Sequence, residues 1–76
     1  MDKILAILKE NCPGIDFENQ KSLVDDGVID SFDVVAIVSD LTSEFDIDIT
    51  INDIVPENFN SIEAINALVE RLIDAD

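Results

Sequence analysis

The chain contains no histidine, tryptophan or tyrosine, and it has a single cysteine, Cys12. Without histidine it cannot form a Ser-His-Asp or Cys-His pair, and it lacks an imidazole ligand for a metal. A lone cysteine cannot form an intramolecular disulfide, which fits a reducing compartment. No cationic neighbour that would lower the pKa of the thiol is visible in the sequence. We therefore interpret Cys12 as a small residue at a helix end.

Long apolar runs and positive charge are also scarce. No segment approaches the ~20 apolar residues of a membrane span, and residues 1–9 lack the features of a signal peptide. We therefore expect a cytoplasmic protein without membrane insertion. Four Lys and Arg oppose eighteen Asp and Glu, which gives a net charge of −14. Such a chain repels nucleic acid and acidic lipid, whereas basic patches on other proteins attract it.

The 76 residues do contain enough apolar surface for one small core, because 47% of them are hydrophobic. This proportion excludes a wholly disordered tail. The length predicts a single domain over residues 1–76 and leaves little chain to enclose a deep active site. We expect an all-α fold that acts as a monomer and is not an enzyme.

Apolar residues at helical spacing predict three main helices, which cover about residues 2–12, residues 30 or 31 to 45, and the stretch that begins at Asn60 or Ser61. Pro13-Gly14 stops the first helix. Asp30 and Ser31 are both good N-caps, and Asp33 adds a negative charge in the first turn, where the helix dipole favours it. Asn60 and Glu63 resemble a capping box for the last helix.

The stretch from Pro13 to Asp30 has turn residues at both ends and lacks a sustained period. Residues 13–30 form a long first loop, and we expect four apolar residues to hold it to the core: Ile15, Phe17, Leu23 and Ile29. A structureless loop of this length in a small domain is often functional. Residues 46–51 alternate polar and apolar residues as a strand does, but no second strand lies nearby to pair with them, so we expect an extended linker. We expect residues 52–55 to form a short helical turn that Pro56 closes.

The second helix has two apolar faces. Five residues form an ordinary core stripe within about 60° of Val34 on a helical wheel: Val34 itself, Ile37, Val38, Leu41 and Phe45. Four others fall outside that stripe, at about 100–200° from Val34 on the wheel: Phe32, Val35, Ala36 and Ser39. Phe32, Val35 and Ala36 therefore form an apolar strip beside Ser31, which is typical of a protein contact site. The alternative is that the long loop folds back and covers Phe32 and Val35.

Ser31 lies where the long loop meets this helix. Taken alone, an Asp-Ser pair before an apolar run is what any N-cap looks like. The surrounding residues 23–32, LVDDGVIDSF, resemble the loop-to-helix junction of acyl and peptidyl carrier proteins. The resemblance continues through Leu41, Glu44 and Phe45, through Ile49, and through residues 61–65 at the start of the last helix. It covers nearly the whole chain and implies an acyl-carrier-like bundle of three main helices plus a short helical turn.

The resemblance also implies a function for Ser31. In that family the serine of the Asp-Ser pair accepts a covalent 4′-phosphopantetheine, so the chain would be a phosphoprotein that carries its cargo as a thioester on the arm. A phosphodiester at a helix N-terminus is favoured by free N–H groups and the positive dipole end. By similarity Asp30 supports the serine and the metal ion of the modifying enzyme. Partner enzymes would contact Phe32, Asp33, Val35, Ala36, Ser39 and Asp40.

The implied partners are a phosphopantetheinyl transferase, a ligase that loads acyl or aminoacyl groups, and synthase enzymes with basic patches. The pathway stays open among fatty-acid, polyketide and related biosynthesis, and D-alanyl carriers of teichoic-acid decoration are an alternative. Phe32 replaces the more usual Leu or Met of the family. Ala36, Thr42 and Ser43 replace residues that are often acidic in carriers of fatty-acid synthesis. An unmodified interaction module is the second alternative.

Two further functions find little support in the residues. Asp46-x-Asp48-x-Thr50 with Glu57 superficially follows a calcium-binding loop, but Ile51 stands where the sharp turn requires glycine. Looser binding of divalent ions to the acidic surface is a separate hypothesis. The adjacent carboxylates of residues 25–26 belong to a loop without a proton shuttle. We therefore assign no catalytic residue and no metal ligand.

Overall fold

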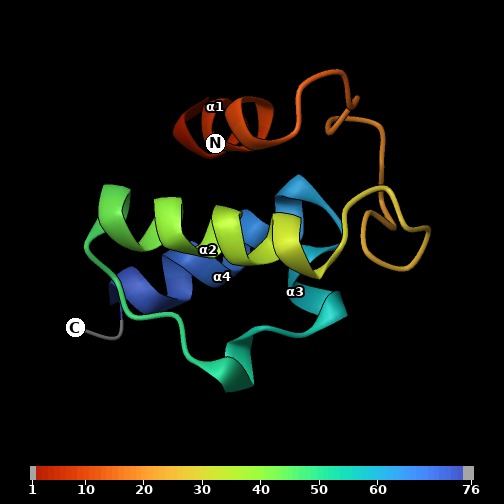
Figure 1. Ribbon diagram of the computed structural model, residues 1–76. Helices are drawn as coiled ribbons and strands as arrows, with labels where there is room; N and C mark the ends of the chain where they lie inside the picture. The colour runs from red at the N-terminus through yellow and green to blue at the C-terminus, as the bar shows by residue number, and fades with distance from the viewer. Residues whose placement is uncertain (1, 75–76) are drawn as a thin grey trace.

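Three long helices build the fold: α1 (Asp2–Asn11), α2 (Ser31–Phe45) and α4 (Ile62–Asp74). The computed structural model describes residues 2–74 of the chain. Two short elements lie between α2 and α4, the 3-10 turn η1 (Ile51–Asp53) and the helix α3 (Pro56–Phe59). Helix α1 packs along α2 and also contacts α4, while α3 packs on α4 (Figure 1). The all-α fold predicted from the sequence, with three main helices and a long first loop, is confirmed.

The apolar stripes of the three helices meet in one core. Buried side chains come from α1 (Ile4, Ile7, Leu8), from α2 (Val34, Ile37, Leu41) and from α4 (Ile62, Ile65, Leu68, Val69). Val38 and Phe45, which the wheel placed in the α2 stripe, are half-buried and pack against this core. Helix α2 begins and ends where the sequence predicted, and its C-cap Asp46 adopts the left-handed conformation that often ends a helix.

Apolar side chains of the long loop between α1 and α2 are buried in the core and hold the loop in place. Phe17, Leu23 and Ile29 are buried, and Ile15 packs against the core cluster, as the sequence predicted. The Ile29 N–H donates to the Leu23 carbonyl at 3.0 Å, which closes the loop just before α2. Gly27 lies between these two residues with a φ of 72°, a left-handed value that most side chains disfavour.

The prediction that Pro56 closes a helical turn over residues 52–55 is wrong in its boundary. The turn η1 spans Ile51–Asp53, and Pro56 instead opens α3 as its first residue. Proline is suited to that position because the first N–H groups of a helix have no intrahelical acceptor. Residues 47–50 form the extended linker that the alternating sequence predicted, and no strand is present among residues 2–74.

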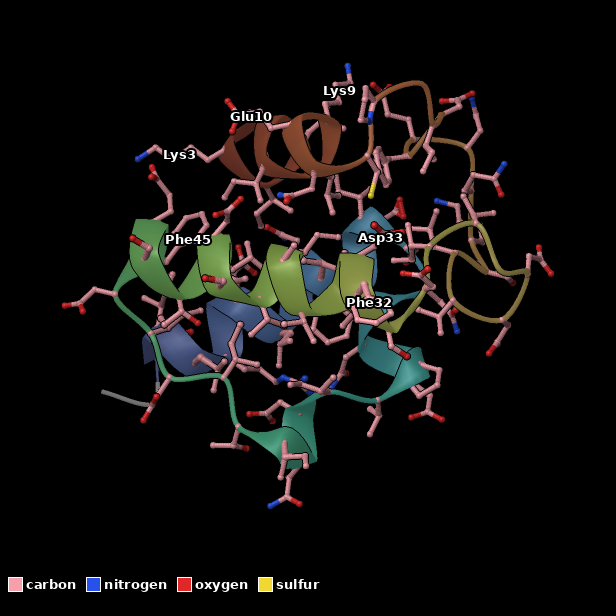
Figure 2. All side chains as sticks on the ribbon, viewed as in Figure 1. Lys3, Lys9, Glu10, Phe32, Asp33 and Phe45 are labelled. Carbon is pink, nitrogen blue, oxygen red and sulfur yellow. The ribbon has the colours of Figure 1, made fainter. Side chains whose placement is uncertain are left out.

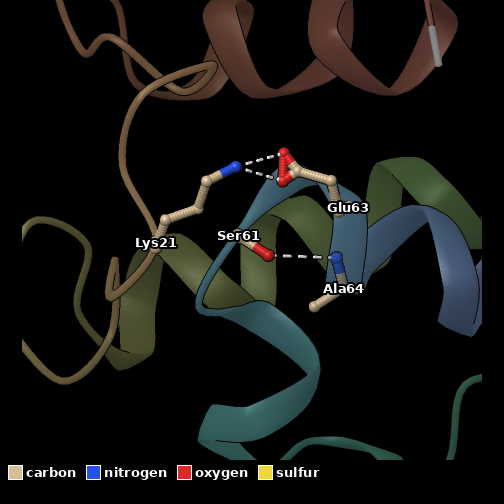
Figure 3. A network of polar contacts seen from close by, with 4 residues as sticks. All are labelled: Lys21, Ser61, Glu63 and Ala64. Carbon is tan, nitrogen blue, oxygen red and sulfur yellow. Dashed lines mark hydrogen bonds and ion pairs between the residues drawn. The ribbon is translucent and has the colours of Figure 1, made fainter.

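The predicted capping box of Asn60 and Glu63 is also wrong. Ser61 is the residue that caps α4, because its Oγ accepts a hydrogen bond from the Ala64 N–H at 3.1 Å (Figure 3). Glu63 instead faces the long loop, where Lys21 Nζ lies 2.6 Å from both of its carboxylate oxygens. This hydrogen bond lowers the pKa of Glu63. The sequence offered two adjacent cap candidates, and the long-range contacts decided between them.

Within residues 2–74, no helix has both the length and the apolar character that a bilayer crossing requires.

Candidate functional site

Ser31 is the first residue of α2, and a reciprocal pair of hydrogen bonds fixes the backbone around it. Asp30 Oδ1 accepts from the Asp33 N–H at 3.0 Å, and Asp33 Oδ2 accepts from the Asp30 N–H at 3.3 Å. Asp30 is the N-cap with an extended backbone, and its carbonyl accepts the first helical bond, from the Val34 N–H. The serine therefore stands at an exposed, well-defined helix start.

Two backbone N–H groups at the start of α2 are not engaged by the capping box. The first four N–H groups of a helix have no partner one turn earlier. The side chains of Asp30 and Asp33 satisfy each other's N–H groups, while the N–H groups of Ser31 and Phe32 lie too early in α2 for an intrahelical bond. These two groups, with the positive end of the helix dipole, suit an oxyanion attached to the Ser31 hydroxyl.

A cavity of about 210 Å³ opens beside Ser31. Its walls come from three segments: Val24 of the long loop, Val34 and Val35 of α2, and four residues that lead into and through α3, namely Ile54, Val55, Pro56 and Phe59. All of these lining side chains except Ser31 are apolar. The only hydroxyl of the lining is thus the one at the start of α2, next to a surface that can shelter a small apolar group.

The apolar strip on α2 is exposed. The side chain of Phe32 is 86% exposed and that of Val35 is 61% exposed, so the long loop does not fold over them. Figure 2 shows Phe32 at the Ser31 end of α2, with Phe45 at the opposite end. Ala36 and Ser39 are exposed as well, as the helical wheel predicted. The alternative in which the loop covers this strip is therefore wrong.

The two acidic residues predicted to face partners are both engaged within the chain. Asp33 is half-buried and belongs to the capping box. Asp40 is exposed, and its Oδ2 accepts a hydrogen bond from Asn11 Nδ2 at 2.8 Å. The same amide group, on the last residue of α1, donates to the Ile7 carbonyl one turn earlier in that helix. Asp40 thus links α2 to α1 in addition to contributing negative charge at the surface.

Sequence reasoning missed two residues on the far side of the cavity. Ile51 is 84% exposed on η1, and Ile54 is partly exposed and lines the cavity. Ile51 ends the alternating segment of residues 46–51, in which Ile47 is buried. The chain turns at Thr50, and this turn directs Ile51 outward. The signal that could have identified it was the Asn-Asp pair that follows, which favours a turn.

The remaining sequence candidates do not join this site. Cys12 is buried, and burial, followed by the nearby Asp33 carboxylate, raises the pKa of its thiol. In the segment that resembles a calcium loop, Thr50 and Asp53 form a capping box with each other. Among the described residues, no three carboxylate or thiol side chains gather closely enough to hold a metal ion. Asp25 Oδ2 accepts a hydrogen bond from Asn60 Nδ2 at 3.1 Å.

Comparison with known proteins gives one informative match. The chain is 36% identical over 66 residues to aminoacyl carrier protein 1 of Bradyrhizobium diazoefficiens. The aligned residues cover 87% of this chain and 72% of that relative. No protein-family model matches the chain, and no solved structure matches it. The relative, the helix order and the serine at the start of α2 all agree with the family that the sequence resembles.

Proposed function

Since the chain belongs to the family of acyl and peptidyl carrier proteins, we propose that it carries an acyl or aminoacyl group on a 4′-phosphopantetheine arm attached to Ser31. Residues 1–76 would then act as one carrier domain that is not itself an enzyme. The observation that supports Ser31 most directly is its position, exposed at the first turn of α2 and on the edge of an apolar cavity. When attached, the arm supplies a terminal thiol on which cargo is held as a thioester.

The residues around Ser31 fit a phosphodiester at that position. The modifying enzyme would transfer the arm with its phosphate from coenzyme A to Ser31 Oγ. A phosphorus–oxygen bond to Oγ would form as the pyrophosphate bond of coenzyme A breaks, the nucleoside 3′,5′-bisphosphate would leave, and the enzyme would take up the serine proton. The N–H groups of Ser31 and Phe32 would then lie next to the new negative charge. Asp30 Oδ1 already accepts a hydrogen bond from the Asp33 N–H. We propose that the other oxygen of Asp30 faces the transferase and its magnesium ion.

The strip of Phe32, Val35 and Ala36 is the proposed contact surface for partner enzymes, with Asp33, Ser39 and Asp40 around it. A partner with an apolar depression and a basic rim would complement both the exposed phenyl ring and the net charge of −14. A phosphopantetheinyl transferase, a loading ligase and synthase enzymes all have to reach Ser31. They would therefore use this end of α2 in turn.

An aminoacyl group is the cargo class that we favour. The relative is named for an aminoacyl cargo. The cavity of about 210 Å³ is of the size that accommodates a small group, because a cavity of about 150 Å³ already admits benzene. A D-alanyl group falls within this class.

The test is incubation of the purified chain with coenzyme A, magnesium and a promiscuous phosphopantetheinyl transferase, followed by intact mass spectrometry. We expect the addition of one arm to the wild type and none to Ser31→Ala. Ser43→Ala is the matched control, because Ser43 is also an exposed serine of α2 but lies outside the proposed contact surface, and it should be labelled like the wild type. Labelling of Ser31→Ala would exclude Ser31 as the site, and an unlabelled wild type would favour the unmodified interaction module.

A further inference from the structure

Asn60 lies between α3 and α4 and makes four hydrogen bonds to the long loop. Its Oδ1 accepts from the Val24 N–H at 3.0 Å and from the Asp25 N–H at 3.1 Å. Its Nδ2 donates to Asp25 Oδ2 at 3.1 Å, and its backbone carbonyl accepts from the Leu23 N–H at 2.8 Å. A side-chain amide offers an acceptor to two backbone donors and a donor to a carboxylate at once.

These hydrogen bonds join two walls of the cavity beside Ser31. Val24, whose N–H is held by Asn60, forms the loop wall, and Phe59, which directly precedes Asn60, forms part of the α3 wall. The same loop is closed by the hydrogen bond from the Ile29 N–H to the Leu23 carbonyl. A continuous path of hydrogen bonds and short chain segments therefore runs from Asn60 through residues 23–29 to the N-cap of α2.

We propose that Asn60 is a positioning residue for the modification of Ser31. It holds the loop before Ser31 against the α3–α4 junction, and thereby keeps the cavity mouth in the form that the modifying enzyme binds. This inference rests on the proposed carrier function. Asn60 does not touch the reacting atoms and acts only through the loop. Its role differs from that of the Asp30–Asp33 capping box, which fixes the helix start locally.

The expected effect is on binding rather than on the chemical step. Without the side chain of Asn60, the loop N–H groups of Val24 and Asp25 lose their acceptor, and the loop populates displaced conformations. A protein whose binding-competent state is populated only in part binds more weakly by that fraction. If the competent population falls to about one fifth, the KM for the carrier rises about fivefold, while kcat stays within about twofold.

The first measurement compares wild type, Asn60→Ala and Asn58→Ala in steady-state transfer of the arm from coenzyme A. Asn58 is the matched control because it is also a half-buried asparagine close to Asn60 in the sequence, and its Nδ2 also donates a hydrogen bond, to the Asp53 carbonyl at 2.8 Å. Within residues 2–74 its side chain forms hydrogen bonds to Asp53 and Arg71 and none to the loop before Ser31. Asn60→Ala should raise KM about fivefold, and Asn58→Ala should leave KM near the wild-type value.

The second measurement exchanges the two partners of the side-chain hydrogen bond. Asn60→Asp keeps an acceptor for the two backbone N–H groups but places a carboxylate against that of Asp25, so KM should rise. In the double variant Asn60→Asp with Asp25→Asn, the amide donor and the carboxylate acceptor have changed places, and KM should return towards the wild type. Asp25→Asn alone keeps an acceptor for Asn60 and should change KM little. Amide hydrogen exchange at Val24 and Asp25 should rise and fall in parallel with KM.

The outcomes separate this inference from the function on which it rests. An unlabelled wild-type chain overturns the carrier function itself. A labelled wild type with an unchanged KM for Asn60→Ala overturns the role of Asn60, as does an equal rise in KM for Asn58→Ala. If Asn60→Ala does not fold, the comparison of Asn60→Asp with the double variant tests the inference instead. A double variant with a KM no lower than that of Asn60→Asp then overturns the positioning role of Asn60.

Discussion

Asp30 and Asp33 hold the start of α2 by accepting each other's backbone hydrogen bonds, at 3.0 Å and 3.3 Å. Ser31 stands between them in the sequence, yet its hydroxyl takes no part in this cap. Many helices use a serine hydroxyl as the cap itself. Here the carboxylates perform that task, so the hydroxyl of Ser31 can be modified without loss of the helix start. This division of roles is the local feature that best suits Ser31 to carry a prosthetic group.

Replacement of Asp30 tests this division of roles. Asp30→Ala removes the acceptor for the Asp33 N–H and should lower the free energy of unfolding by about 0.5–2 kcal/mol. Asp30→Asn keeps a capping oxygen and should lie close to the wild type in stability. Urea unfolding followed by circular dichroism measures both. Asp26→Ala, an exposed residue of the preceding loop, is the control, and an equal loss there would mean that the cap contributes nothing specific.

Phe32 and Leu41 lie on the same helix with opposite surroundings, and this contrast gives a second prediction. Phe32 is 86% exposed, whereas Leu41 is fully buried. Phe32→Ala should change the free energy of unfolding by no more than about 0.5 kcal/mol, and Leu41→Ala should lower it by about 2–5 kcal/mol. Phe32→Ala should weaken the binding of a partner enzyme more than Leu41→Ala does. Loss of the ring contact should weaken the Kd about tenfold, which corresponds to about 1.4 kcal/mol.

The control for this pair is measured on the same samples. Leu41→Ala, assayed at a temperature where it remains folded, should bind the partner with nearly the wild-type Kd. A loss of several kcal/mol in the stability of Phe32→Ala would mean that the ring is buried in solution. An unchanged Kd for Phe32→Ala would remove this residue from the contact surface.

The sequence predicted α2 and its two faces well because the information is local. Helical periodicity separates the inward Val34, Ile37 and Leu41 from the outward Phe32 and Val35, and the wheel needs no knowledge of other segments. The start at Asp30 and Ser31 is likewise set by side chains within one turn of the helix. The same holds for the apolar residues that fasten the long loop, since large apolar side chains are strongly driven into a core.

The junction of α3 and α4 could not be predicted in the same way. Asn60 and Ser61 are both good N-cap residues, and no local rule separates them. The choice depends on Asn60 binding the loop at residues 24–25 and on Glu63 pairing with Lys21, which are contacts between distant segments. The cavity beside Ser31 has the same origin, because its walls come from three separate parts of the chain. Sequence reasoning therefore found the serine but not the cavity next to it.

The buried thiol of Cys12 gives a prediction for alkaline pH. Burial raises its pKa above the ordinary value of 9.0. The unfolded chain therefore loses this proton first as the pH rises. The contribution of Cys12 to the free energy of unfolding should be fully present below pH 9.0 and should decline as the pH rises through the folded-state pKa.

Cys12→Ala provides the comparison, because it removes this titration and leaves those of the lysines and acids. Urea unfolding of both proteins between about pH 7 and pH 10.5 spans the ordinary thiol pKa. The difference between their free energies should be flat below pH 9.0 and should shrink above it. A difference that stays constant over the whole range would mean that the folded thiol titrates like a free one.

The net charge of −14 is the basis of the last prediction. Like charges on a small surface repel one another and oppose folding, and added salt screens this repulsion. Among the described residues, two ion pairs offset it: Lys3 with Glu44 at 3.5 Å and Lys21 with Glu63 at 2.6 Å. The Tm should therefore rise as sodium chloride is increased from about 0.01 M to about 0.15 M, over which the Debye length falls from about 30 Å to about 8 Å.

A variant with three fewer negative charges separates repulsion from other effects of salt. Glu10→Gln, Glu18→Gln and Asp48→Asn combine three exposed residues from α1, the long loop and the linker. This triple variant should melt at a higher temperature than the wild type in low salt and should gain less from sodium chloride. Parallel salt curves for the two proteins would show that repulsion is not the cause. If magnesium chloride at matched ionic strength raised the wild-type Tm further and in a saturable way, divalent ions would bind the acidic surface specifically rather than only screen it.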